Sequence, residues 1–128
     1  MKRPFSAAAT APDSSTVVTK AAVRAATLLH FSQKQLGEVL GMSPSSVSRM
    51  YKGDFKIPEK SGKSLELALM LVRVFRSLDA MVGGDAEKSR AWLAAGNRHL
   101  GGIPMTLIGT VEGLGRVGQY LDAMRGEL

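Results

Sequence analysis

The segment QKQLGEVLGMSPSSVSRMYKG, residues 33–53, meets the steric requirements of two short helices that cross at a tight turn. The first helix needs apolar residues one turn apart, which Leu36 and Leu40 supply, and a small residue at the crossing, which is Gly37. The turn needs a residue that tolerates a positive φ, and Gly41 does so. Met42 then fills the core beneath the turn.

The second helix of this segment presents two chemically different faces. Val47 and Met50 point inward, and Pro44 stands in the first turn, where a missing N–H is harmless. The outward face has no acid. Short hydroxyls allow a helix to sit deep in a major groove, Arg49 suits a guanine, and Lys52 suits a phosphate.

The segment therefore predicts a DNA-binding helix-turn-helix. Gln33 belongs to the same surface, because side-chain amides and free N–H groups at a helix start meet phosphates. The predicted DNA contacts are Gln33, Ser43, Pro44, Ser45, Ser48, Arg49 and Lys52. The alternative is an ordinary helical hairpin whose polar face is only solvated.

Helical periodicity continues on both sides of this segment, and no useful stretch alternates with period two, so we expect an all-α fold. Residues 1–12 resemble a loose arm, and residues 13–63 form the helix-turn-helix domain. Its first helix is expected from about Ser15 to Leu29, with an apolar face of Val17, Ala21, Ala25 and Leu28. A linking helix spans 64–82, and short helices follow in a C-terminal domain, 83–128.

The linking helix carries two apolar stripes. Leu65, Ala68, Val72 and Phe75 form one, and Leu67, Leu71, Val74, Leu78 and Met81 form the other. A surface helix needs only one such stripe. Either the second stripe faces another copy of the chain, or both are buried within one chain, and the pattern leaves both open. We expect a homodimer held by the face that includes Leu71 and Val74.

Charge and composition narrow the function classes. The net charge of +6 divides into +7 for residues 1–76 and −1 for residues 77–128, which favours a polyanionic partner for the first part. The chain has no cysteine, which fits a reducing cytoplasm. We expect no signal peptide and no membrane helix, since no stretch approaches the ~20 apolar residues that a membrane span needs.

No catalytic or metal-ligating set is evident. His30 and His99 lie in unrelated segments, the first expected to pack at a helix end and the second to face solvent. No carboxylate cluster has metal spacing, and no glycine-rich phosphate loop follows a strand. We therefore expect a binding protein with no cofactor and no enzymatic activity.

The C-terminal domain has its own pattern of structural residues. Trp92 is expected to anchor the core, Gly102 and Pro104 to shape a turn, and Gly113 to permit close packing. Val117 and Leu121 are expected to face inward, and Thr110 to cap the last helix.

Two resemblances rest on these residues. Residues 33–53 resemble the Xre-type helix-turn-helix. The string Trp92-Leu93, Asn97, Leu100-Gly101-Gly102, Pro104, Thr110, Gly113, Val117, Leu121 is similar to the C-terminal domain of the Xre–MbcA–ParS antitoxins. The likeness covers about residues 20–128.

The resemblance implies a specific function. Such antitoxins are dimers in hetero-oligomeric complexes, and they bind RES-domain toxins that degrade NAD or ADP-ribosylate a protein. The toxin's NAD site is blocked, in several members by the extreme C-terminus, here Arg125, Gly126, Glu127 and Leu128. The helix-turn-helix then implies autoregulation through operator DNA. The alternative is a stand-alone regulator whose C-terminal domain only dimerises.

Overall fold

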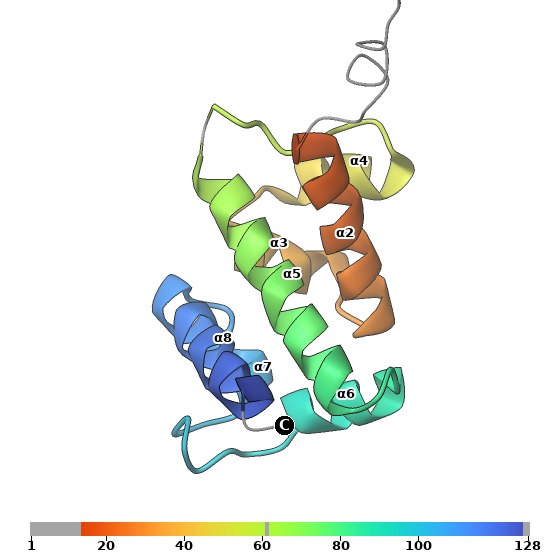
Figure 1. Cartoon of the computed structure of the whole chain (residues 1–128). Coiled ribbons are helices and arrows are strands. Elements are labelled where there is room, and N and C mark those ends of the chain that lie inside the picture. The colour runs from red at the N-terminus through yellow and green to blue at the C-terminus, as the bar shows by residue number, and fades with distance from the viewer. Residues whose placement is uncertain (1–13, 61, 127–128) are drawn as a thin grey trace, which may run out of the picture.

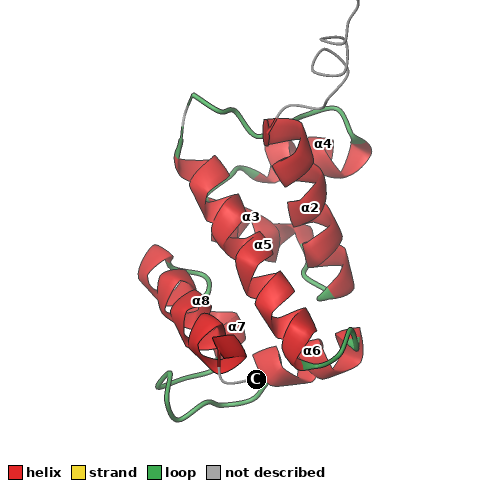
Figure 2. Ribbon diagram, in the orientation of Figure 1, coloured by secondary structure: helices red, strands yellow, loops and turns green. Residues whose placement is uncertain are grey.

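The computed structural model describes residues 14–60 and 62–126, which form seven helices and no strand. The predicted all-α fold is thus confirmed, and the predicted arm lies outside the described residues. Figure 2 shows the helices joined by loops. In chain order the helices are α2 (Ser14–Leu28), α3 (Gln33–Leu40), α4 (Pro44–Lys52), α5 (Lys63–Met81), α6 (Ala86–Ala94), α7 (Pro104–Leu107) and α8 (Val111–Gly126).

Helix α5 runs through the middle of the molecule, with α2 and α3 packed against it from one side and α8 from the other (Figure 1). The stripe that contains Leu71 and Val74 is largely buried within the chain, and these two residues are only 0% and 1% exposed. The other stripe buries Ala68 and Val72, and its Leu65 and Phe75 are partly buried against the same core. A Cβ on Gly118 of α8 would lie 3.7 Å from Val74 Cγ2. The expectation that the stripe of Leu71 and Val74 holds a second copy is therefore wrong, because α8 covers it.

Helix α2 buries a different face from the one that was predicted. Val17 is 48% exposed, and the buried apolar residues are Val18, Ala22, Ala25 and Ala26. Two polar residues share this buried face: the Ser15 hydroxyl donates to the Ile57 carbonyl, and the Ile57 N–H donates to Thr19 Oγ1 at 2.9 Å. This face turns inward because these bonds hold the loop after α4 against α2.

The buried side chains of both halves form one continuous core, from Val18 of α2 to Leu121 of α8. A polar contact reinforces the junction, since Arg90 of α6 donates from Nη1 to the Leu28 carbonyl at 2.8 Å. That carbonyl ends α2, where no intrahelical donor is available. The two halves of the chain are thus one packing unit built around α5.

Candidate nucleic-acid interface and C-terminal platform

Helix α4 separates its inward and outward residues as the sequence predicted. Val47 and Met50 are buried, Ser48 is half-buried, and the remaining predicted contact residues of the helix are exposed: Pro44, Ser45, Arg49 and Lys52. Gly41 takes φ 66° at the end of α3, which a residue with a Cβ seldom adopts. A Cβ on Gly37 would lie 2.9 Å from the Met42 carbonyl oxygen, so the helix crossing requires glycine.

Ser43 differs from the other predicted contacts, because its hydroxyl is occupied within the helix start. It is the N-cap of α4 and accepts from the Ser46 N–H at 3.3 Å. The same hydroxyl donates to Ser46 Oγ at 3.1 Å. Ser43 therefore orients the helix. Ser45 Oγ lies 3.3 Å from the same oxygen, so the Ser45 hydroxyl takes part in this network.

Arg49 of α4 and Gln33 of α3 are both exposed. The Arg49 guanidinium sits 5.1 Å from the Phe55 ring centroid, a cation–π contact that restrains a long side chain. Gln33 is exposed at the first position of α3. A complete capping box precedes it, in which Ser32 and Gln35 satisfy each other's backbone N–H groups.

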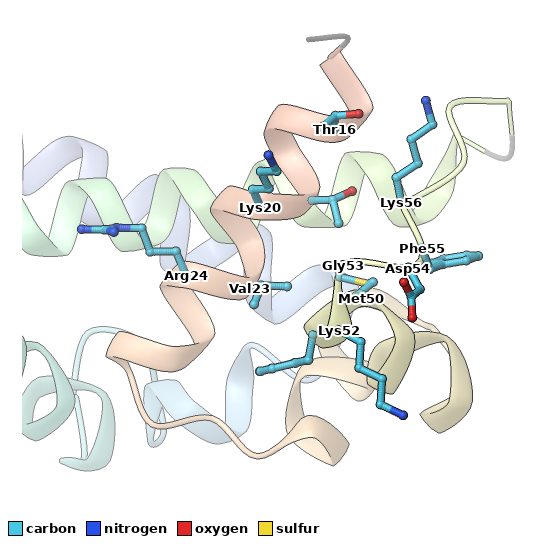
Figure 3. Close-up of a pocket in the computed structure, with 12 residues that line it drawn as sticks. Thr16, Lys20, Val23, Arg24, Met50, Lys52, Gly53, Asp54, Phe55 and Lys56 are labelled. Carbon is cyan, nitrogen blue, oxygen red and sulfur yellow. The ribbon is translucent and has the colours of Figure 1, made fainter.

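A hollow of about 620 Å³ lies between α2 and α4. Figure 3 shows Lys20 and Arg24 along α2, with Lys52 and Lys56 across from them. The sequence reasoning missed Lys20 and Arg24 as part of a basic surface. The i, i+4 spacing of Lys20 and Arg24 shows that both lie on one face of α2. That this face borders the same hollow as Lys52 follows only from the packing of α2 beside α4.

Tyr51 lines this hollow and has an unusual hydroxyl. The oxygen is hidden from solvent and has no hydrogen-bond partner among the described residues. Burial disfavours the phenolate and raises the pKa of Tyr51.

The C-terminal half is built on a tight turn and a close helix contact. Asn97 holds the turn, since its Oδ1 accepts from the Leu100 N–H and its backbone pairs with Gly102. Thr110 Oγ1 accepts from the Gly113 N–H at 3.0 Å and caps α8. A Cβ on Gly113 would lie 1.9 Å from the Leu107 carbonyl oxygen, so only glycine fits there.

Val117 and Leu121 face inward as predicted, whereas Trp92 packs only against the edge of the core. Trp92 is half-buried, and the fully buried apolar residue of α6 is its neighbour Leu93. The Trp92 ring stacks on Tyr120 with centroids 6.3 Å apart, and His99 stacks on the same tyrosine at 5.9 Å. Trp92 thus belongs to an aromatic stack at the surface of α6 and α8.

The predicted toxin-blocking residues fall partly within α8. Arg125 and Gly126 are its last helical residues, and Arg125 Nη1 donates to Ser77 Oγ of α5 at 3.2 Å. The expectation of a free four-residue tail is therefore wrong for these two, because helix and side-chain contacts hold them. Glu127 and Leu128 lie outside the described residues.

Metal-binding and membrane-spanning features are absent from the part of the chain that the structure describes. No group of three His, Asp or Glu side chains there has a geometry that suits a metal ion. His99 faces solvent, as predicted; His30 lies just past the end of α2, but its side chain is exposed and not packed, because a φ of 59° turns it away from the helix. None of the described helices is long and apolar enough to cross a membrane.

Comparison with protein families assigns both halves. A model of the antitoxin Xre-like helix-turn-helix domain matches residues 8–73, and a model of the antitoxin Xre/MbcA/ParS C-terminal toxin-binding domain matches residues 77–126. The chain belongs to the Xre/MbcA/ParS antitoxin family. A search of curated proteins found no significant match.

In this antitoxin the two family matches meet inside α5, between residues 73 and 77. Here α5 contributes to a second hollow, about 690 Å³, between itself and the end of α8. Arg73, Arg76 and Arg125 line it together with Ser77 and Asp122. Of these, the sequence reasoning selected only Arg125.

Proposed function

We propose that this antitoxin neutralises a RES-domain toxin by covering the toxin's NAD site, and that it represses its own operon through α4. The observation that carries the proposal is the match of the toxin-binding model to residues 77–126, which include α6, α7 and α8. The helix-turn-helix match on the other half supports the regulatory role. Both roles are binding roles, and we propose that the chain has no enzymatic activity of its own.

The C-terminal platform is suited to supply affinity. It offers a surface aromatic stack around Tyr120 and exposed apolar side chains at Ile103 and Val111. Large aromatic and apolar groups of this kind carry much of the binding energy of protein interfaces. Arg125 holds the end of α8 against α5, so the chain leaves this helix from a fixed point. We propose that residues 125–128 obstruct the NAD cleft from there.

The regulatory half is suited to reading DNA in the same complex. Ser45, Ser48 and Arg49 are proposed to face bases, with Lys52 and Gln33 on phosphates. We further propose a homodimer, since operators for such helices have paired half-sites. Its interface does not use Leu71 and Val74, which are buried within one chain.

A truncated chain can distinguish blocking of the toxin's NAD site from binding of the toxin. Removing residues 127–128 leaves α8 intact, so the toxin is still captured in a pull-down, while NAD turnover and growth arrest return on co-expression. The contrasting variant is Leu93→Ala, which truncates a fully buried side chain and costs ~2–5 kcal/mol, so capture and neutralisation are lost together. Full neutralisation by the truncated chain places the blocking residues elsewhere on the domain.

A further inference from the structure

The hollow between α5 and the end of α8 has an excess of positive charge. Three guanidinium groups, those of Arg73, Arg76 and Arg125, line it with the single carboxylate of Asp122. Arg73 and Arg76 belong to the basic part of the chain, residues 1–76, whereas Arg125 belongs to residues 77–128, whose net charge is −1. The packing of α8 against α5 brings all three to one hollow.

A connected set of hydrogen bonds fixes the walls of the hollow. Asp122 accepts from Arg73 Nη2 through Oδ2 at 2.9 Å and from Ser77 Oγ through Oδ1 at 3.0 Å. Ser77 Oγ in turn accepts from Arg125 Nη1 at 3.2 Å. Ser77 is only 1% exposed, so the network is anchored in the packed seam between the helices.

Within the part of the chain that the structure describes, two of the three guanidinium groups have no counter-ion. Among the described residues, the ion pair of the hollow joins Arg73 and Asp122, and neither Arg76 nor Arg125 has a carboxylate within ion-pair distance. The guanidinium fork binds carboxylates through two parallel hydrogen bonds. Because Ser77 already orients Arg125, less side-chain freedom is lost when an anion binds.

We infer that this hollow receives an acidic side chain of the partner toxin, paired with Arg76 and Arg125. The inference rests on the proposed function and names the chemistry of one contact in it. Ser77, Asp122 and Arg125 lie within the toxin-binding match, and Arg76 directly precedes it, while Arg73 ends the helix-turn-helix match. Figure 1 places the end of α8 and α4 at opposite ends of the molecule, which favours the toxin over operator DNA as the anion.

The test is calorimetric titration of the full chain with a purified RES-domain toxin. Arg76→Glu is expected to weaken binding at least ~tenfold, the scale of a close interfacial charge pair, and to flatten its salt dependence. Arg76→Gln is expected to give a smaller loss. Lys63→Glu is the control: an exposed residue at the start of α5, outside the hollow and outside the toxin-binding match, with the same change of charge, expected to shift the affinity less than ~threefold.

Each outcome has a distinct meaning. If the wild-type chain binds no RES-domain protein, the proposed function fails. If it binds and Arg76→Glu matches the Lys63→Glu control, the inference is overturned while the proposed function stands. If Arg76→Glu retains toxin affinity but loses operator affinity, the hollow serves DNA and the inference is again overturned. Circular dichroism verifies that the variants keep their helices.

Discussion

Helices α4 and α8 are the two elements through which we propose that this antitoxin contacts its partners, and they divide packing from recognition differently. In α4 the buried Val47 and Met50 alternate with exposed residues such as Arg49 along nine residues. In α8 the buried stripe of Val117 and Leu121 has a separate surface on each flank. The aromatic stack of Tyr120 lies on one flank, and Asp122, with its arginines, lies on the other.

This difference determines how well the binding residues of each half can be predicted from its sequence pattern. The pattern of the helix-turn-helix holds its packing residues and its predicted contacts on one short helix, so periodicity alone separates them. The pattern of the C-terminal domain consists of residues such as Gly113 and Leu121, which are scaffold. The proposed binding surfaces also use side chains that are not in that pattern, such as Arg76 of α5 and Tyr120 of α8.

The largest expected effect comes from a substitution in α5, the helix against which both halves of the chain pack. Leu71→Ala truncates a fully buried side chain of α5 and is expected to lower the free energy of unfolding by ~2–5 kcal/mol. Because the core is continuous, DNA binding and toxin binding should disappear in one urea transition. The control is Leu69→Ala on the same helix, 44% exposed, with an expected change within ~0.5 kcal/mol. Two separate transitions would show that the halves fold independently.

The next effect tests whether α8 is scaffold where its pattern is strongest. Gly113→Ala places a Cβ against the Leu107 carbonyl and is expected to cost about 3 kcal/mol, with loss of toxin capture. Gly115→Ala in the same helix meets only Met70 Cε, at an ordinary 3.6 Å. It should be neutral or stabilising by up to ~1 kcal/mol, since alanine favours a helix. Equal stabilities in urea titrations of the two variants would contradict the close contact.

A smaller effect sharpens the division within α4. Arg49→Ala is expected to cost ~1–3 kcal/mol on the specific operator and to relax sequence preference. Lys52→Ala should weaken binding to every duplex and reduce the salt slope, as loss of a phosphate contact does. Titration of operator and scrambled duplex at several salt concentrations measures both. A wild-type chain without preference between the duplexes would refute base contacts by Ser45, Ser48 and Arg49.

The smallest effect concerns the hollow between α2 and α4. Tyr51→Phe removes a hidden hydroxyl without a partner among the described residues, so stability should rise by ~0.5–1 kcal/mol. Because the pKa of Tyr51 is raised in the folded state, the folded chain holds the phenol proton more tightly than the unfolded chain does. The contribution of this protonation to the free energy of unfolding is complete below the unfolded pKa near 10 and is lost as pH rises through the folded pKa. The wild type should therefore lose this stability at high pH, and Tyr51→Phe should not. Thermal melts at pH 7 and above pH 10 measure the difference.

The sequence predicted most of the fold and one of the two surfaces. The order of helices and the cap at Thr110 followed from local chemistry. The face of α2 did not, because Ser15 and Thr19 are buried by bonds to Ile57, about forty residues away. The arginine hollow was missed for the same reason: Arg73 and Asp122 are 49 residues apart and meet only through the α5–α8 packing.

The two-sided burial of α5 also bears on how such antitoxins diversify. Leu67 lies 3.9 Å from a Cβ placed on Gly41 of the DNA-reading half, while Val74 rests against Gly118 of the toxin-binding half. If two homologous genes recombined before or after α5, this helix would pack on one side against helices from the other homologue. If they recombined within α5, both of its packing faces would combine residues from the two homologues. Recombination near α5 is therefore expected to disturb the packing of this helix. New toxin specificity is expected to arise by point changes on the exposed flanks of α8, inherited together with the DNA reader.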